Sequence, residues 1–401
     1  MPHAEFVLSG DLILADRILP AGAVLVRDGR IADLGPRAEM LAGLPPGVEQ
    51  SAFDGFISPG FVDLHVHGGR GADFMDGNED AFATVLRAHA LHGTTSLLPT
   101  STAARHEQIL AMLDLCRQFK LRRDARGARV LGAHFYGPYF RAEARGCHPA
   151  SPIRAPEPCE YEQYLEFADA IATASIAPEL PGAEPFARDC AERGIRLNAG
   201  HTHATFLQMA AAIDWGVRHV DHLYCAMSDK AKLRQQQPYP MQGGVLEATL
   251  YFDELTTEVI ADGKHLSADL LLLAWKIKGP DRLALATDCN RALDLPEGSY
   301  IFGPEADGEP FISHDGVGKM PDGQALASSV RGMDHMVRTF ASLTGRPLWE
   351  VVRMASLTPA RIAGWDSELG SLEVGKRADF VALGRDLEVK ATYIDGIKLS
   401  E

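Results

Sequence analysis

The sequence lacks the features that would place the protein in a membrane or on nucleic acid. It has no apolar run near the roughly 18 residues that a membrane-spanning helix needs. Its 39 Lys and Arg are outnumbered by 54 Asp and Glu, which gives a formal charge of −15. Nucleic acids and acidic membranes attract basic surfaces, so this composition argues against both as partners. A small molecule is the expected partner.

Cysteine pairs and a leader segment are also missing. The six cysteines are scattered without a CxxC pair, which in a chain of 401 residues indicates reduced thiols rather than a disulfide framework. Residues 1–20 contain no basic segment followed by an apolar stretch, so they do not predict a signal peptide. Together these observations predict a cytoplasmic protein.

The two ends of the chain differ in pattern from its middle. Short apolar runs and the turn pair Asp28-Gly29 predict strands in the first 58 residues, and similar runs follow Gly370. We therefore expect a small β-sandwich domain formed by residues 1–58 plus 365–401.

The middle of the chain, residues 59–364, alternates short apolar runs with helical stretches, as βα units do. Helices are expected at 80–91, 105–119, 184–193, 204–215 and 267–277, with a helix-rich tail at 328–363. Eight strand candidates end near His65, Pro99, His134, Ala177, Gly200, His222, Asp262 and Asp288. Eight such units favour an α/β fold of the TIM type, a closed (β/α)₈ barrel, over an open sheet.

Histidines and aspartates fall at the ends of these strand candidates. His65 and His67 follow an apolar run, and residues two apart on a strand point to the same side. HxH alone is a weak motif, but His201, His222 and Asp288 close three further strands. In a barrel these strand ends converge on the active site, and imidazole and carboxylate are the ligands of zinc and similar ions. The pattern therefore predicts a metal site.

The other histidines are interpreted differently. His203 falls in a loop or helix start beyond the strand end, so it is left out of the metal site. Four further histidines are interpreted as structural or solvated: His89, His92, His219 and His314.

Segments along nearly the whole chain resemble one family, in the same order. PGFVDLHVHG (59–68) is similar to the first-strand signature of the amidohydrolase superfamily. Further segments resemble the N-acetylglucosamine-6-phosphate deacetylases: GTTSLLPT (93–100), GAHFYGPY (132–139), RGCHP (145–149), AGHTHAT (199–205), DHLYCAM (221–227), IADGKH (260–265), LATD (285–288) and LGSLEVGKRADFV (369–381).

The resemblance implies roles for the matching residues. Asp288 resembles the catalytic aspartate that accepts a proton from water and passes it to the leaving amine. His201 and His222 resemble metal ligands, and His65 and His67 resemble the ligand pair of two-metal members. Substrate-binding residues implied in the same way are Gly137, His148, Cys225, Ala226, Arg234 and His265.

Phosphate binding and assembly are also implied only by resemblance. Arg234 and His265 resemble the phosphate-binding cations, although the QQQPYPMQGG that follows Arg234 departs from the family's Arg-Glu-Pro-Gly. Cys225 stands where the family has asparagine, and a thiol is a weak donor, so phosphate recognition is in question. A homodimer is implied as well, in which His265 would reach the neighbour's site.

The largest departure concerns the metal. The family has a metal-binding glutamate in its HxEGP segment, whereas residues 134–138 read HFYGP with Tyr136 at that place. A phenol with a pKa near 10 is a poor substitute for a carboxylate. We therefore expect one ion, with His222 orienting the water or the substrate carbonyl and Tyr136 facing the substrate. The expected ligands are His65, His67, His201 and Asp288.

These observations predict a metal-dependent hydrolase that removes an N-acyl group, foremost N-acetyl, from an amino sugar or its 6-phosphate. The expected cofactor is one zinc ion per chain, with iron, manganese or cobalt as alternatives. Two other functions stay open: a deaminase or cyclic-amide hydrolase with a mononuclear site, and a catalytically inactive relative that acts as a binding protein.

Overall fold

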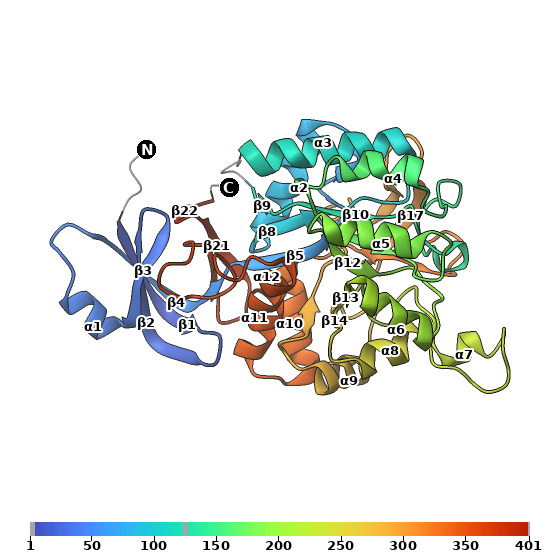
Figure 1. Cartoon of the computed structure of the whole chain (residues 1–401). Helices are drawn as coiled ribbons and strands as arrows, with labels where there is room; N and C mark the ends of the chain where they lie inside the picture. Colours follow the sequence, from blue (N-terminus) through green and yellow to red (C-terminus); the bar gives the residue numbers. More distant parts are fainter. Residues whose placement is uncertain (1–4, 123–126, 400–401) are drawn as a thin grey trace.

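A computed structural model of the protein describes residues 5–122 and 127–399. A sheet built from both ends of the chain lies beside a larger α/β body (Figure 1). The outermost residues of the predicted β domain, 1–4 and 400–401, are outside the described part. Among the described helices none is long and apolar enough to cross a membrane.

The terminal sheet joins strands from the two ends of the chain in the order β22-β21-β20-β4-β1-β2-β3. These strands are β1 (Phe6–Ile13), β2 (Ile18–Arg27), β3 (Arg30–Pro36), β4 (Glu49–Pro59), β20 (Phe380–Leu383), β21 (Val389–Ile394) and β22 (Ile397–Lys398). Arg30, at the start of edge strand β3, forms an antiparallel bridge with Arg377, which lies just before β20 in the chain. The sheet thereby encloses an apolar core that includes Leu8, Val24 and Phe380.

This arrangement is the small β-sandwich domain predicted from both termini. Helix α1 (Arg37–Ala42) covers a second apolar cluster, in which Met40 packs against Val7 and Ala23. The predicted boundaries, 1–58 plus 365–401 against 59–364, remain a proposal. The strands themselves place the passage between the two units close to Gly60, since β4 ends at Pro59 and the next strand begins at Phe61.

Eight parallel strands form the barrel: β5 (Phe61–Val66), β8 (Thr94–Pro99), β10 (Ala133–Tyr136), β11 (Ile171–Ile176), β12 (Arg196–Ala199), β13 (Val217–Val220), β14 (Thr256–Val259) and β15 (Leu283–Leu285). Strand β5 pairs with β8, and β10 to β15 pair in chain order. The Thr100–His134 and Val66–Cys289 bridges join the two sets into a closed ring. The predicted (β/α)₈ barrel is therefore confirmed, and it brings the C-terminal ends of all eight strands to one face.

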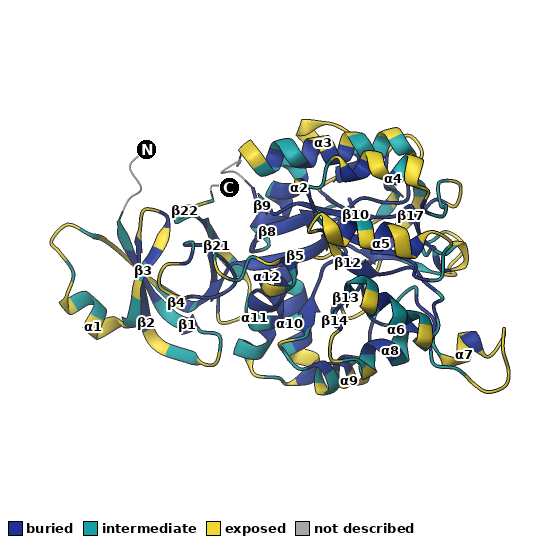
Figure 2. Ribbon diagram, viewed as in Figure 1, coloured by how far each residue is buried: buried dark blue, intermediate teal, exposed yellow. Residues whose placement is uncertain are grey.

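Helices surround the barrel, with exposed outer faces and buried inner faces (Figure 2). Helix α3 shows why: its buried residues Ile109, Met112, Cys116 and Phe119 recur every three or four positions, which is one helical face. The helices are α2 (Glu79–Leu91), α3 (His106–Arg122), α4 (Pro158–Leu165), α5 (Ala183–Glu192), α6 (Phe206–Trp215), α8 (Val245–Tyr251), α9 (Ala268–Lys278), α10 (Met333–Thr344), α11 (Leu348–Ala355) and α12 (Leu357–Ala363).

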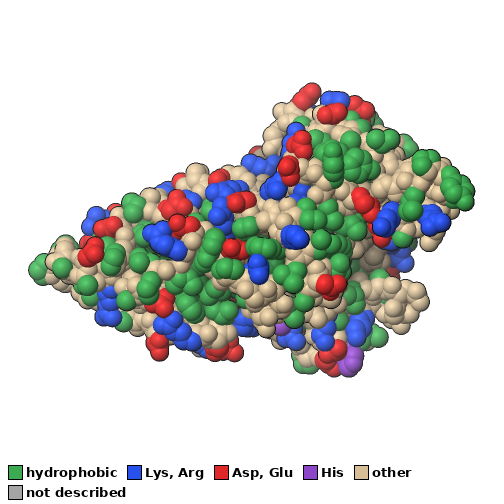
Figure 3. Space-filling view, turned by 90° about the horizontal axis from the view of Figure 1, so that it is seen from below, with side chains coloured by type: hydrophobic (Ala, Val, Ile, Leu, Met, Phe, Trp, Pro, Cys, Tyr) green, Lys and Arg blue, Asp and Glu red, His purple; other side chains and the backbone are tan. Residues whose placement is uncertain are grey.

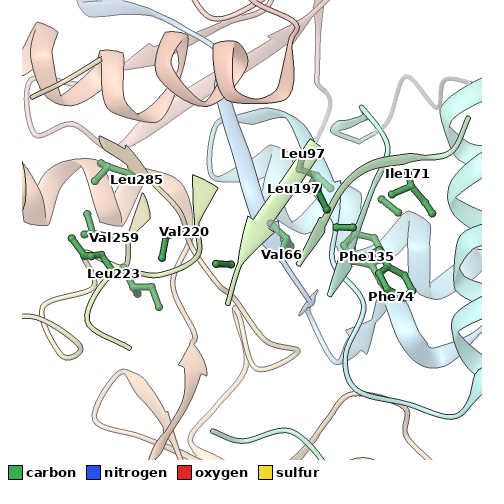
Figure 4. Close-up of a cluster of buried hydrophobic side chains, with 14 of the residues drawn as sticks. Val66, Phe74, Leu97, Phe135, Ile171, Leu197, Val220, Leu223, Val259 and Leu285 are labelled. Atoms are coloured by element: carbon green, nitrogen blue, oxygen red, sulfur yellow. The ribbon is translucent and has the colours of Figure 1, made fainter. Parts of the chain in front are cut away.

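The main apolar core lies between these helices and the strands. Outward-facing strand residues such as Phe135, Leu197 and Val220 contribute to it (Figure 4). Phe135 packs against Tyr164 and Phe186 with ring centroids 5.1 and 6.1 Å away. Because side chains alternate along a strand, its neighbours His134 and Tyr136 point the other way, into the barrel.

The sequence did not predict a four-stranded antiparallel sheet that lies between β15 and α10. Its strands are β16 (Gly298–Phe302), β17 (Glu309–His314), β18 (Val317–Lys319) and β19 (Leu326–Ser329). The remaining short elements are β6 (Gly68–Gly69), β7 (Ala72–Asp73), β9 (Arg129–Val130), the 3-10 turns at 74–76 and 142–144, and α7 (Lys230–Leu233). In Figure 1, α7 lies at the end of the molecule away from the terminal sheet.

On the face shown in Figure 3, basic and acidic side chains are interspersed. No extended area of one sign stands out on that face.

His92 provides a pH-dependent contribution to stability. Its ring bonds to Asp334 (2.9 Å) and Asp294 (3.0 Å). Burial alone would lower the pKa of His92, but the two aspartates raise it from 6.5 to about 9. Because the pKa of His92 is higher in the folded state, its protonated ring stabilises the fold. This contribution is complete below pH 6.5 and is lost as the pH rises towards 9. We expect His92→Gln to lower the free energy of unfolding by on the order of 2 kcal/mol below that window.

Urea unfolding of both proteins at a series of pH values measures this difference. The gap between wild type and His92→Gln should shrink towards zero above pH 9. A gap that stays constant across the series would show that the ring acts through packing and not through its charge.

Candidate metal centre

Each predicted metal ligand lies at or just beyond the C-terminal end of a barrel strand. His65 is the fifth residue of β5, and His67 follows its end; both are essentially buried. Asp288 follows β15, and its backbone N–H donates to the carbonyl oxygen of His65 (2.9 Å). This bond fixes the carboxylate beside the two rings, so the barrel closure itself builds the centre.

Two histidines and the aspartate form one group of possible ligands. Asp288 Oδ1 lies 3.2 Å from His67 Nε2 and 3.7 Å from His65 Nε2. The ligand atoms of His65, His67 and Asp288 all lie within 4.8 Å of one another. Ser328 Oγ donates a hydrogen bond to Asp288 Oδ1 (3.2 Å).

A second group stands beside the first. The Nε2 atoms of His201 and His222 face each other at 3.3 Å, and Tyr136 Oη lies 2.5 Å from His222 Nε2. His201 Nδ1 donates to the carbonyl oxygen of Ala144 (2.7 Å), so its Nε2 carries a lone pair. Such a lone pair is a donor that could hold a divalent ion at this side of the centre.

The backbone at these positions is held in the left-handed region. The φ angles are 44° at His201, 26° at His222 and 44° at Asp288. Ser328 beside Asp288 has φ 63°. Side-chain-bearing residues there cost of order 1–3 kcal/mol each and persist where function selects them. Strain at three predicted ligands supports their assignment to one site.

The charges of the centre are strongly coupled. Burial alone would raise the pKa of Asp288, but His65 and His67 hold it well below its usual range. Burial would likewise lower the pKa of His65, which Asp288 and Glu258 raise to about 9. The buried Tyr136 has its pKa raised well above 10, so the phenol stays protonated. A neutral Tyr136 acts as a hydrogen-bond partner and not as an anionic ligand.

The residues fit a divalent metal ion. His65 Nε2 is buried and has no hydrogen-bond partner among the described residues, while its Nδ1 is bonded to Glu258. A buried imidazole nitrogen without a partner costs free energy unless it binds something. Imidazole nitrogens and one carboxylate are the donor set that zinc, iron, manganese and cobalt share.

A pocket of about 630 Å³ opens above the centre. It is lined by His67, His201, His222, Asp288 and Tyr136, so both ligand groups border the same space. The predicted substrate residues His148, Cys225, Ala226 and His265 line it too. His65 and Gly137 lie behind this lining. Gly137 has φ 75°, and a Cβ at this position would lie only 2.9 Å from the backbone N of Ala103.

Two of the lining histidines present a defined nitrogen to the pocket. The N–H of Ala103 donates to His148 Nδ1 (3.2 Å), so His148 carries its proton on Nε2 and can donate from there. His265 Nδ1 is bonded to Asp262 Oδ2 (2.7 Å), which leaves its other nitrogen for a ligand. Burial raises the pKa of Cys225 to about 12, so its thiol is a neutral, weak donor.

The structure does not bring Arg234 to the pocket. Arg234 follows α7 on the exposed surface, while Lys232, two residues earlier, lines the pocket. Lys232 Nζ donates to the carbonyl oxygen of Met227 (2.7 Å), which holds the ammonium at this edge. Sequence reasoning missed Lys232, because the KAKLR segment offers three cations and only the turn of α7 selects among them.

The pocket lining does not include His89, His203, His219 or His314. The buried His89 donates from Nε2 to the carbonyl oxygen of Gly68 (3.0 Å), and burial lowers its pKa to about 4. His314 pairs with Glu297 on the surface. His203 is half-buried over Glu179, which accepts a bond from its backbone N–H. His219 is the exception in position, since it lies inside the barrel, 3.5 Å from Glu258.

Sequence reasoning also missed Glu258. It lies on β14, is 1% exposed, and its Oε1 is 2.7 Å from His65 Nδ1. A signal was present, because a charged residue inside the apolar strand run before IADGKH is rarely buried without a partner.

Comparison with known proteins agrees with this geometry. The sequence pattern described as "Amidohydrolase family" matches residues 56–398. The chain belongs to the amidohydrolase family. A much shorter match, residues 22–45, is to the bacterial imidazolonepropionase-like composite domain.

This chain is similar to several known proteins over nearly its whole length. It is 34% identical over 372 residues to the N-acetylgalactosamine-6-phosphate deacetylase of Escherichia coli O157:H7, covering 92% of this chain and 93% of the relative. It is 30% identical to the N-acetylglucosamine-6-phosphate deacetylase of Bacillus subtilis, covering 98% and 97%. The crystal structure of the Pasteurella multocida N-acetylglucosamine-6-phosphate deacetylase superposes with a TM-score of 0.90 at 28% identity, covering 99% and 100%.

The superfamily predicted from PGFVDLHVHG is thereby confirmed. The amidohydrolase is a hydrolase of carbon–nitrogen bonds. Its family generally depends on divalent metal ions, and the buried histidine–aspartate group supplies ligands of the matching kind.

Proposed function

We propose that this amidohydrolase removes the N-acetyl group from an amino sugar or an amino sugar 6-phosphate. The observation that carries the proposal is the position of Asp288. Its carboxylate is held against His65 and His67 at the floor of a polar pocket large enough for a sugar. Similarity to deacetylases of two N-acetylhexosamine 6-phosphates supports this substrate class.

We propose that the metal is zinc, one ion per chain, held by His65, His67, His201 and Asp288. A bound divalent ion polarises the acyl carbonyl and makes water nucleophilic near neutral pH. Asp288, with its depressed pKa, accepts the proton of the attacking water and returns it to the leaving nitrogen. Glutamate is absent at position 136, which supports one ion over two.

Other pocket residues position the substrate in this proposal. His222 Nε2–H donates to Tyr136 Oη at 2.5 Å in this proposal, which leaves the phenol O–H to donate to the acyl oxygen as negative charge develops. His148 donates from Nε2 to a sugar hydroxyl, since its Nδ1 accepts from Ala103. Cys225 and Ala226 border the far side together with His265.

We also propose that the protein is cytoplasmic and forms a homodimer in which His265 reaches the site of the neighbouring subunit.

A deaminase or cyclic-amide hydrolase is the second candidate function, because a histidine–aspartate centre with one ion also suits ring substrates. The inactive alternative is opposed by the strained backbone kept at His201, His222 and Asp288.

Acetate release measures the proposed activity directly. The purified protein is incubated with N-acetylglucosamine and N-acetylgalactosamine, each with and without a 6-phosphate, and with cyclic amides and aminopyrimidines. We expect acetate from at least one sugar. Turnover confined to the ring compounds would replace the deacetylase proposal with the second candidate.

Tyr136 is predicted to contribute through its hydroxyl. Tyr136→Phe removes the donor beside His222 and should lower kcat about 10-fold, the effect of one lost hydrogen bond in the transition state. Tyr136→Glu should bind a second ion, because it returns a carboxylate to the edge of both ligand groups. Steady-state kinetics and elemental analysis check the two variants. An unchanged kcat in Tyr136→Phe would remove the hydroxyl from the mechanism.

Lys232 and Arg234 form a matched pair for phosphate recognition. Lys232 lines the pocket and Arg234 does not, so Lys232→Ala should raise KM for a 6-phosphate substrate about 10-fold. Arg234→Ala should leave KM unchanged, and neither variant should affect the non-phosphorylated sugar. The reverse result would return the phosphate role to Arg234 and would mean that α7 moves on binding.

A further inference from the structure

The inside of the barrel below the metal centre is polar. Barrels of this type are usually filled with layers of bulky apolar side chains. Here Asp221 accepts hydrogen bonds from Ser175 Oγ (2.5 Å) and Asn198 Nδ2 (2.8 Å), and Glu258 faces His65 and His219. Such a network lowers the free energy of unfolding unless every buried polar group in it has a hydrogen-bond partner.

Glu258 is the member of this network that touches the centre. Its Oε1 lies 2.7 Å from His65 Nδ1, and the two side chains are 1% and 0% exposed. They come from β14 and β5, which are not hydrogen-bonded neighbours in the barrel. The contact therefore crosses the barrel interior and depends on its closed form.

The bond defines which nitrogen of His65 faces the ligand group. With Nδ1–H donated to Glu258, Nε2 is the ring nitrogen left for an ion, and it is the atom near Asp288. Within the described chain that Nε2 has no hydrogen-bond partner. A carboxylate behind a ligating imidazole also raises its basicity and fixes the ring plane.

Glu258 also supplies charge. Asp288 is the one carboxylate in the group formed by His65, His67 and Asp288, and the protonated Tyr136 brings none. The Glu258 carboxylate lies between two imidazoles, 2.7 Å from His65 Nδ1 and 3.5 Å from His219 Nε2, which is a setting that suits an anion. A divalent ion at His65 would thus be balanced by one carboxylate in contact and one behind the ring.

We infer that Glu258 is the positioning residue of the metal centre: it orients His65 through Nδ1 and provides the second negative charge that Tyr136 does not. This inference rests on the proposed metal-dependent function but concerns ion binding, which is measured without substrate. Glu258 does not line the pocket; it contacts the centre through His65 Nδ1 (2.7 Å) and the backbone N–H of His222 (3.5 Å).

Two substitutions separate orientation from charge. Glu258→Gln keeps an oxygen acceptor for His65 Nδ1–H and removes the charge, and its amide can donate to the unpartnered His219 Nε2. Glu258→Leu removes both acceptor and charge. Zinc is titrated calorimetrically into chelator-stripped protein, and we expect Kd to rise about 10-fold in Glu258→Gln and about 100-fold in Glu258→Leu.

Asp334→Asn is the matched control. Asp334 is also a buried carboxylate bonded to a histidine Nδ1, that of His92 at 2.9 Å, but it lies away from the pocket. This variant should lose stability and keep the zinc Kd of the wild type. It therefore reports what removal of any buried histidine–carboxylate pair does to the fold.

A second readout needs no metal. In chelator-stripped protein with ¹⁵N-labelled histidine, the Nδ1 proton of His65 should give a low-field resonance, assigned by its loss in His65→Gln. It should remain in Glu258→Gln and disappear in Glu258→Leu. If Glu258→Leu does not fold, Glu258→Gln with its retained proton and weaker zinc binding carries the test.

The inference is overturned if folded Glu258 variants bind zinc as the wild type does, or if His65 Nδ1 carries no proton in the wild type. It is also overturned if the wild type binds no zinc. A wild type that binds zinc and releases no acetate from any sugar would overturn the proposed function, while the Glu258 result would still stand on binding and on the resonance.

Discussion

Asp288→Asn should lower kcat by about 10³-fold, or about 4 kcal/mol, and leave the fold intact. Asparagine keeps the size of the side chain and the bond from the Asp288 backbone to His65, so the barrel should close as before. It cannot accept the proton of the attacking water, and it also removes one carboxylate from the ion. Both effects act on the chemical step more than on substrate binding, so KM should change little.

The measurement is steady-state acetate release together with the metal content of each protein. Ser328→Ala is a graded control, because it removes only the hydrogen bond to Asp288 Oδ1 and should cost a few-fold in kcat. Asp294→Asn, which breaks a surface-side pair with His92 and Arg70, should leave kcat unchanged. A rate within a few-fold of wild type in Asp288→Asn, with metal still bound, would transfer the proton role to another group.

Much of this centre could be predicted from the order of residues. His65, His67, His201, His222 and Asp288 each close an apolar run, and parallel strands of a barrel deliver their ends to one face. The period-two spacing of His65 and His67 then decides that both rings point the same way. These inferences need only local patterns plus the closure of the sheet, and the structure places all five side chains together.

The grouping of those ligands could not be predicted, because it depends on the register between strands. The proposed set joins His201 to His65, His67 and Asp288, and the strand pattern does not predict that His201 Nε2 also lies 3.3 Å from His222 Nε2. Which nitrogen each ring presents depends on partners far away in sequence, such as Ala144 for His201 and Glu258 for His65.

The missed elements share one physical reason. Strands β16 to β19 stabilise one another through antiparallel pairs, and their glycine-rich sequence gives only a weak local signal. Lys232 and Arg234 are both exposed, and only the turn of α7 makes Lys232 border the pocket while Arg234 does not. Glu258 acquires a role only when β14 faces β5 across the barrel. Each depends on contacts between segments that the sequence keeps apart.

Removal of the metal should abolish turnover and weaken the fold. The stripped protein leaves His65 Nε2 buried without a partner and the Nε2 lone pair of His201 against His222. We expect kcat to fall at least about 10³-fold, since neither water nor carbonyl is activated. An ion present at 1,000 times its Kd raises the free energy of unfolding by about 4 kcal/mol, and chelation should remove that amount.

The protein is dialysed against a chelator, assayed, and then titrated with zinc, iron, manganese or cobalt in turn. Calorimetric unfolding with and without each ion gives the stability change, and acetate release gives the recovery of activity. The ion that restores both identifies the cofactor. Full activity after chelation, with no metal found by elemental analysis, would contradict the metal centre altogether.

The stoichiometry of that titration decides between one ion and two. The His65–His67–Asp288 group and the His201–His222 pair border the same space, but a second ion there needs a bridging anion to offset the repulsion of two dications. Tyr136, protonated and already bonded to His222, does not provide it. Recovery of activity should therefore end at one ion per chain. The Tyr136→Glu protein should continue to a second equivalent, since it brings the anion to the point where both groups meet.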